Sequence, residues 1–129
     1  MEIAHYFKSC TTCNTHWQTR ADLLDDPNVL LIGYQAFIGH PEKGLILFEH
    51  HVTGCGTSMA ISIGSFQDFY HGEYYDELMY GSEDCPGYCL DPQNLRVCSN
   101  KCKMAFAREI VAYIEKVKAH VLTKSDLKA

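Results

Sequence analysis

The sequence predicts a small α+β fold, and three observations lead to this prediction. The chain has 129 residues, which is the size of one domain. Three successive stretches alternate apolar and polar residues, as half-buried antiparallel strands do. A long final stretch repeats its apolar residues every three or four positions, as an amphipathic helix does. We therefore expect a single domain over residues 1–129, with a β-rich part at 1–63 and a cysteine-rich loop and helix at 64–129.

The first expected elements are a short strand at residues 3–8 and a short helix at about 20–25. Thr19 is a suitable N-cap for this helix, because its hydroxyl can accept a hydrogen bond from a free backbone amide. Asp26-Pro27 should end the helix, since the residue before a proline avoids the helical conformation.

Three strands are expected next, at residues 29–38, 45–51 and 57–63. Short turns containing glycine separate them, so they should form an antiparallel meander. Period-two spacing gives each strand one apolar face. In the first strand this face consists of Leu30, Ile32, Tyr34, Ala36 and Ile38. In the last strand it consists of Thr57, Met59, Ile61 and Ile63.

Helices and a loop should form the second part of the chain, residues 64–129. Ser65 is an expected cap for a short helix over residues 66–70, and Asp91-Pro92 is a typical helix start. Residues 70–88 are rich in tyrosine, glycine and acid, and we expect a loop there. The last helix should span about 99–121. Its apolar stripe consists of Cys102, Phe106, Ile110, Tyr113, Ile114, Val117 and Val121.

The cysteines carry the clearest chemical signal. Their number is seven, and with one histidine added they divide into two groups of four. Four soft ligands are what a closed zinc site or an iron–sulfur cluster requires. The first residues do not resemble a secretory signal, so we expect a cytoplasmic, reducing environment, in which structural disulfides are rare. An odd number of thiols also cannot pair completely, so metal binding is the leading interpretation.

The first expected metal ligands are Cys10, Cys13, His50 and Cys55. The first two form a C-x-x-C turn, and Cys55 lies at the tip of a predicted hairpin, followed by glycine. His50 is favoured because it shares a strand face with Ile46 and Phe48. His51 and His16 remain alternatives, since one is next to the same turn and the other follows the C-x-x-C pair.

Two ligand-bearing turns on hairpins resemble the zinc ribbon, in which two knuckles hold one ion. The resemblance covers about residues 3–63 and implies a tetrahedral zinc ion between the hairpins. The second turn departs from the family, because it has a histidine and one cysteine where a ribbon usually has C-x-x-C. A redox dithiol at Cys10 and Cys13 is the alternative, but the βαβ pattern typical of thioredoxin-like proteins is not visible.

The second expected metal ligands are Cys85, Cys89, Cys98 and Cys102. A Pro-Gly turn separates the first two, so their sulfurs can converge from a loop. The last two are four residues apart at the expected opening of the long helix, which puts them on one helix face. We expect a second zinc ion here. An iron–sulfur cluster and nested Cys85–Cys102 and Cys89–Cys98 disulfides remain alternatives.

Composition and charge limit the kinds of partner that we expect. The net charge is −5 and no basic patch is present, so nucleic acid is not an expected partner. No apolar run approaches the roughly 20 residues that span a bilayer. Residues 66–80 interleave aromatic side chains with acids, which is typical of a surface for a basic protein partner. Packing of these aromatics on the core is the alternative.

No nucleophile elbow, phosphate loop or H-E-x-x-H motif is present in the sequence. His71 lies near Glu73 and Asp76 and could form an acid–base group with them, but such neighbours arise often by chance. The sequence therefore predicts a non-enzymatic binding or adaptor module stabilised by two zinc ions. A redox or iron–sulfur protein is the alternative.

Overall fold

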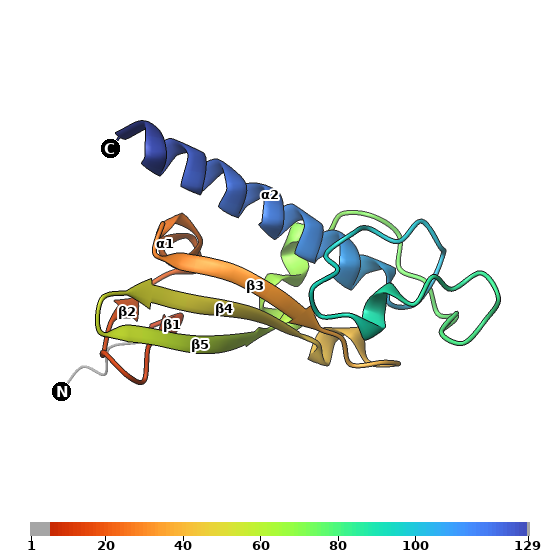
Figure 1. Ribbon diagram of the computed structural model, residues 1–129. Helices are drawn as coiled ribbons and strands as arrows, with labels where there is room; N and C mark the ends of the chain where they lie inside the picture. The colour runs from red at the N-terminus through yellow and green to blue at the C-terminus, as the bar shows by residue number, and fades with distance from the viewer. Residues whose placement is uncertain (1–5, 129) are drawn as a thin grey trace.

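A computed structural model describes residues 6–128, with side chains to residue 123. It confirms the small α+β fold. The three-stranded sheet has the antiparallel order β3-β4-β5, and a separate two-stranded sheet pairs β1 with β2 (Figure 1). The strands are β1 (Lys8–Ser9), β2 (His16–Trp17), β3 (Val29–Gln35), β4 (Leu45–Val52) and β5 (Cys55–Ser62). The helices are α1 (Arg20–Asp25), α2 (Ala105–Lys128) and the 3₁₀ turns η1 (Pro41–Lys43), η2 (Ile63–Phe69) and η3 (Tyr88–Leu90).

Helix α1 begins and ends as the sequence predicts. The Thr19 hydroxyl accepts a hydrogen bond from the amide of Asp22 at 3.1 Å, and the Asp22 carboxylate accepts one from the amide of Thr19 at 3.2 Å. This reciprocal capping box satisfies two amides that have no partner within the helix. The predicted strand at 3–8 lies largely outside the described residues, and β1 begins at Lys8.

The sheet buries one face of each strand. In β4, Ile46, Phe48 and His50 are buried in alternation, as the sequence predicts. In β5 and just after it, Met59, Ile61 and Ile63 are buried in the same way.

Strand β3 departs from the predicted alternation. Its register against β4 shifts between Leu31 and Gly33, so Val29 and Tyr34 are both buried. The prediction that Leu30, Ile32 and Tyr34 share one face was therefore wrong. The extra residue at the register shift moves the side chains that follow it to the opposite face of the sheet.

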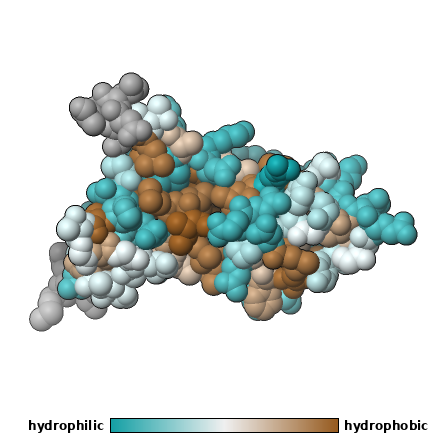
Figure 2. All heavy atoms as spheres, viewed as in Figure 1, coloured by the Kyte–Doolittle hydropathy of each residue, from teal (hydrophilic) through white to brown (hydrophobic). Residues whose placement is uncertain are grey.

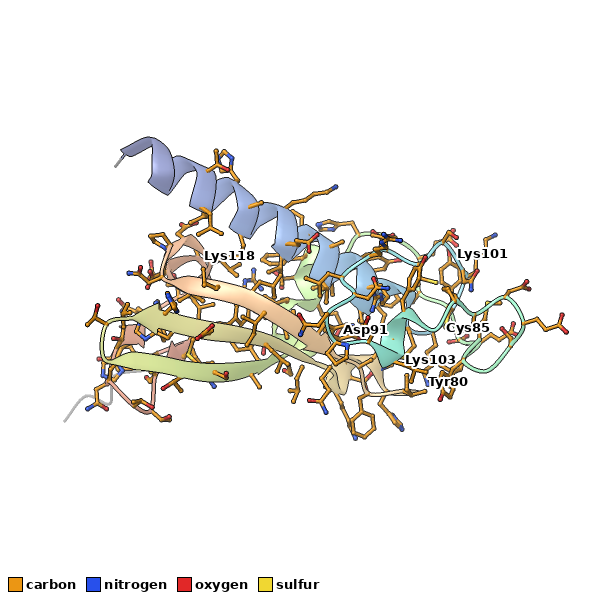
Figure 3. The ribbon with its side chains drawn as sticks, viewed as in Figure 1. Tyr80, Cys85, Asp91, Lys101, Lys103 and Lys118 are labelled. Atoms are coloured by element: carbon orange, nitrogen blue, oxygen red, sulfur yellow. The ribbon has the colours of Figure 1, made fainter. Side chains whose placement is uncertain are left out.

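Helix α2 crosses the molecule and closes the core. Figure 1 shows it running from the cysteine-rich loop, past β3, to the end at which α1 lies. The core cluster draws on both halves of the chain and includes Leu23, Val29, Ile46, Phe48, Phe66, Phe106, Ile110 and Ile114. In the second half of the helix, the Lys118 ammonium donates to the carbonyl oxygens of Leu24 and Asp26 at 2.9 and 2.8 Å (Figure 3).

The long helix begins later than predicted. It starts at Ala105 instead of about residue 99, because the preceding polar groups bond elsewhere. The Asn100 side chain donates to the carbonyl of Asp84 at 2.7 Å, and the amide of Lys103 donates to the carbonyl of Glu77 at 2.7 Å. These bonds tie the segment to the loop, so Cys98 and Cys102 both precede the helix.

Two further predicted helix starts were wrong. The Asp91-Pro92 segment forms a turn, in which the Asp91 carboxylate accepts from the amide of Gln93 at 3.0 Å. The carbonyl of Pro92 instead accepts a hydrogen bond from the amide of Tyr34 at 2.9 Å, which attaches the turn to β3. Near residue 66 the chain forms the 3₁₀ helix η2, which begins after Ser62 without a side-chain cap, so Ser65 is not its N-cap.

The segment from residue 70 to 104 is largely loop, and η3 is the regular element that the structure shows in it. Tyr80, Cys85, Lys101 and Lys103 all lie at this end of the molecule (Figure 3). In the face shown in Figure 2, hydrophobic residues gather in the middle and hydrophilic ones lie around them. Among the described residues, no helix is both long and apolar enough to cross a bilayer.

Candidate metal centre

The β1–β2 hairpin supplies two ligands. Its turn is closed by the amide of Cys10, which donates to the carbonyl of Thr15 at 2.8 Å, and by the amide of Asn14, which donates to the carbonyl of Cys10 at 3.0 Å. Asn14 has a φ of 60°, a left-handed conformation that asparagine tolerates better than most residues. The turn holds Cys10 and Cys13 close together on the side that faces the main sheet.

The β4–β5 hairpin supplies the other two ligands. Val52 pairs with Cys55 across a two-residue turn in which Gly54 has a φ of 82°. Glycine adopts such a conformation without strain, which allows the tight reversal. Cys55 is 8% exposed and His50 is 3% exposed, so both are held inside the fold.

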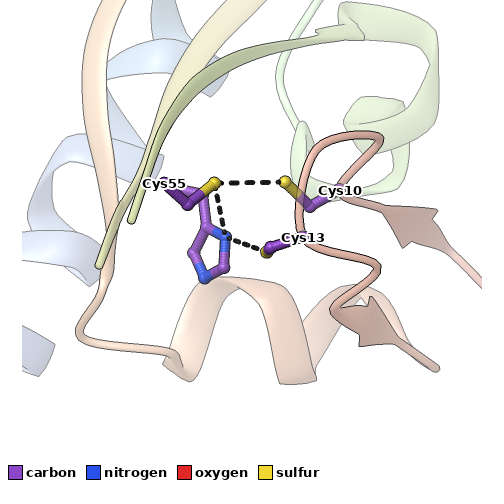
Figure 4. A group of neighbouring side chains, drawn as sticks. Cys10, Cys13 and Cys55 are labelled. Atoms are coloured by element: carbon purple, nitrogen blue, oxygen red, sulfur yellow. Dashed lines mark hydrogen bonds between the residues drawn. The ribbon is translucent and has the colours of Figure 1, made fainter. Parts of the chain in front are cut away.

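The four side chains converge on one point (Figure 4). The sulfurs of Cys10 and Cys55 lie 3.6 Å apart, and the Nδ1 atom of His50 lies 3.4 Å from the Cys13 sulfur and 3.7 Å from the Cys55 sulfur. All four ligand atoms lie within 4.8 Å of one another. Sulfurs at about 2.3 Å and a nitrogen at about 2.0 Å from a tetrahedral zinc ion would be about 3.5–3.8 Å apart. The arrangement therefore has the dimensions of a Cys₃His metal site.

The backbone of the first turn favours the charged form of a ligand. The pKa of the Cys10 thiol is lowered to about 6, most strongly by the amide of Cys13 and also by the His50 side chain, the Thr12 amide and the Cys55 side chain. Burial opposes them. Metals bind the thiolate form of cysteine, so a turn that favours the thiolate of Cys10 also favours metal binding.

The histidine of the site is His50. The Trp17 ring packs edge-on against its imidazole, with 5.0 Å between the ring centroids, and this contact helps to orient it. His51 points away, is exposed and lies 3.7 Å from the Glu49 carboxylate. His16 bonds the Ser9 hydroxyl at 2.7 Å and stacks on the Tyr6 ring. Neither alternative histidine belongs to the group.

The second set of cysteines lies around one cavity of about 30 Å³. Its lining includes Cys85, Cys89, Cys98, Cys102 and Arg108. Within residues 6–128 the structure brings no three of these sulfurs within the 4.8 Å that the first group satisfies. The expected loop-plus-helix arrangement was wrong, because both pairs lie in the loop. Metal binding at these cysteines stays a prediction.

The second set has an electrostatic feature of its own. Burial raises the pKa of the Cys89 thiol, the Arg108 guanidinium opposes this, and the other three thiols add to it. Arg108 is 1% exposed and was not among the predicted site residues. The burial of Arg108 could have been predicted from its position, because it lies on the apolar stripe of α2 between Met104 and Val111.

The aromatic segment 66–80 divides into a buried and an exposed part. Phe66 belongs to the core, and the Tyr70 ring packs on Phe106. Tyr74 and Tyr80 are about half exposed, at 53% and 47%. Packing of the aromatics on the core therefore holds for part of the segment, and the rest is exposed. His71, Glu73 and Asp76 are all exposed, and binding of a partner stays a prediction.

A complete set of four protein ligands leaves no coordination position for a substrate, so the Cys₃His group suits a structural ion better than a catalytic one. Comparison of the chain with protein-family models, with curated proteins and with solved structures finds no match, so the site rests on its own geometry.

Proposed function

We propose that this chain is a non-enzymatic binding module whose N-terminal part is fastened by a structural zinc ion. The ion would be held by Cys10, Cys13, His50 and Cys55. The observation that carries the proposal is the tetrahedral spacing of their sulfur and nitrogen atoms. Three thiolates and one imidazole are a common ligand set for structural zinc, whereas magnesium and calcium prefer oxygen.

The fold gives such an ion a structural task. Strands β1 and β2 have two residues each, and a two-stranded hairpin of that size is marginal without further support. An ion between this hairpin and β4–β5 would attach it to the main sheet, much as two knuckles do in a zinc ribbon. The likeness to that family is part of the proposal.

Two adjacent histidines provide a matched test of the site. We expect His50→Ala to lose about one equivalent of zinc per chain, because it removes a buried ligand, and His51→Ala to retain it. Elemental analysis of protein purified without chelator measures both. Equal zinc content in the two variants, or another metal in the wild type at one equivalent, would contradict the proposal.

The proposed binding surface is the exposed part of segment 66–80. Tyr74, Leu78 and Tyr80 are exposed there and lie among acidic residues. Aromatic side chains bury much area at little entropic cost, and acids favour a basic partner. Supporting the proposal, five carboxylates at Glu73, Asp76, Glu77, Glu83 and Asp84 are exposed along the same loop.

A short arginine-rich peptide is the probe for this surface. We expect NMR shift changes at Tyr74 and Tyr80 that disappear at high salt, because screening weakens attraction between exposed charges. A Glu73→Gln/Asp76→Asn variant should respond less than the wild type. Shift changes confined to other parts of the chain, or none at all, would refute the assignment of the surface.

We also propose that the protein works in a reducing compartment such as the cytoplasm, where its thiols stay reduced and can bind a metal.

A further inference from the structure

A cation is buried beside the second set of cysteines without an acidic partner. The Arg108 guanidinium is 1% exposed and donates to the carbonyl oxygens of Asn94 at 2.7 Å, Arg96 at 2.7 Å and Tyr88 at 3.3 Å. Among the described residues, no carboxylate lies within salt-bridge distance of it. A buried charge is strongly unfavourable unless an opposite charge compensates it. Negative charge on the cysteines beside Arg108 would therefore be favourable.

The same arginine lines the cavity that the cysteines surround. This cavity of about 30 Å³ is bounded by Cys85, Cys89, Cys98 and Cys102. A cavity lined by four thiols offers the soft ligands that zinc binds in closed structural sites. Both cysteine pairs of the loop therefore line one cavity, although no three of their sulfurs lie as close together as the ligand atoms of the first group.

We propose that Cys85, Cys89, Cys98 and Cys102 form a second zinc site, an all-cysteine one, whose charge Arg108 balances. Four thiolates around a divalent ion carry a net charge of −2, and the guanidinium reduces this to −1. Each thiol loses its proton to solvent when the ion binds, so no oxidant or reductant is needed. The site goes beyond the first metal centre and does not depend on it.

Backbone contacts fit this assignment. The amide of Met79 donates to the Cys102 sulfur at 3.3 Å, and amides in such positions stabilise the charged form of sulfur. Gly87 has a φ of 76° between the first two cysteines, which allows a tight turn. Binding of an ion would have to draw these sulfurs together, to the spacing of about 3.8 Å that a tetrahedral site requires.

The main test compares Cys98→Ser with Ser99→Ala in the full chain. We expect about two zinc ions per chain in the wild type and in Ser99→Ala, and about one in Cys98→Ser. Because the loop loses its ion, protease should then cleave residues 70–100 of the cysteine variant faster. Two zinc ions with unchanged cleavage in Cys98→Ser would overturn the proposal.

Cobalt distinguishes the two sites by their ligands. Co²⁺ replaces zinc in tetrahedral sites, and its visible spectrum depends on the number of sulfur ligands. In His50→Ala the remaining cobalt should have the spectrum of four thiolates, and in Cys98→Ser that of three thiolates and an imidazole. If only His50→Ala lacks the expected spectrum of four thiolates, the second zinc site is overturned. If only Cys98→Ser lacks the expected spectrum of three thiolates and an imidazole, the zinc ion of the proposed function is overturned.

Iron and disulfides give clear contrary results. Iron with inorganic sulfide in freshly purified protein would establish a cluster at these cysteines instead of zinc. Loss of four free thiols without bound metal would establish two disulfides instead of a metal site. Either result overturns the second zinc site.

Arg108 variants test the charge balance. Arg108→Met should weaken zinc at the second site at least tenfold in competition with a chelator, and leave the first site unchanged. Arg108→Lys keeps the charge and should recover most of that affinity, whereas a role limited to hydrogen bonding would leave both variants equally weak. Equal loss in the two variants would overturn the role of Arg108 as the balancing charge.

Discussion

At the scale of single residues, two buried cations of α2 hold irregular backbone in place. Arg108 bonds three carbonyl oxygens of the cysteine-rich loop, and Lys118 bonds the two carbonyls at the end of α1. The last carbonyls of a helix have no partner within it, so a donor from outside satisfies them. Each cation thus ties α2 to backbone that lies outside this helix.

Lys118 gives a prediction about pH. Burial lowers its pKa from the usual value to about 8, and the nearby Asp26 and Asp25 carboxylates oppose this. The unfolded chain, with a lysine pKa of about 10.4, then holds more protons than the folded one between these values. Stability should therefore rise with pH in that window, by up to about 1.4 kcal/mol per pH unit from this group.

Urea denaturation of the wild type and Lys118→Met below and above pH 8 measures this effect. The free energy of unfolding of the wild type should increase relative to that of the variant as pH rises. Comparison within the pair removes the contributions of the thiols and of bound metal. Lys116→Met, which alters an exposed lysine of the same helix, is the control. If the free energies of unfolding of wild type and Lys118→Met changed in parallel with pH, the effect would be disproved.

At the scale of elements, β3 holds the loop that carries the second set of cysteines. Its Tyr34 amide bonds the carbonyl of Pro92, and Gly33 lies so close that an added Cβ would be 2.9 Å from the same oxygen. Real Cβ atoms hardly ever approach a backbone oxygen so closely, so the strand or the loop must move to admit one. The glycine is therefore a contact point between sheet and loop.

Gly33→Ala should destabilise the protein by about 1–3 kcal/mol, because it overpacks this contact. Gly64→Ala is the matched control, since its Cβ would meet the carbonyl of Glu42 at an ordinary 3.5 Å. Chemical denaturation of both variants measures the difference. If they were equally stable, the loop would not be held at Gly33.

The success of sequence-based prediction also varies by element. The three strands and α1 were predicted well, because alternation and capping are local signals, and the alternation in β4 also favoured His50. The register shift in β3 and the late start of α2 were not predicted, because they depend on distant partners such as Pro92 and Glu77. Arg108 was missed for the same reason, since its partners lie in a loop without periodicity.

At the scale of the whole molecule, the two cysteine groups lie at opposite ends of a shared core. Figure 1 shows the β1–β2 hairpin at one end and the cysteine-rich loop at the other, with the sheet and α2 between them. The core residues between the ends, such as Phe48, Phe66 and Ile110, are apolar and need no metal to pack. The two ends should therefore respond to metal separately.

Removal of metal with a chelator tests this independence. We expect the amides of residues 7–18 to exchange hydrogen faster, because the hairpin loses its attachment, whereas those of β4 and β5 keep most of their protection. Hydrogen exchange followed by mass spectrometry measures both regions. Uniform loss of protection over the whole chain would show that the core itself depends on the ion.

The turn that carries Cys10 has a consequence for the order in which the chain folds. Its partner Cys55 follows 45 residues later, so an ion that binds both closes a large ring. Treated as a covalent link, a ring of that size lowers the entropy of the unfolded chain enough to stabilise the fold by about 4 kcal/mol. During synthesis the hairpin emerges first and must wait for β5 before the ring can close. The β1–β2 hairpin is then made before its partner hairpin and is among the last of the described elements to be fixed.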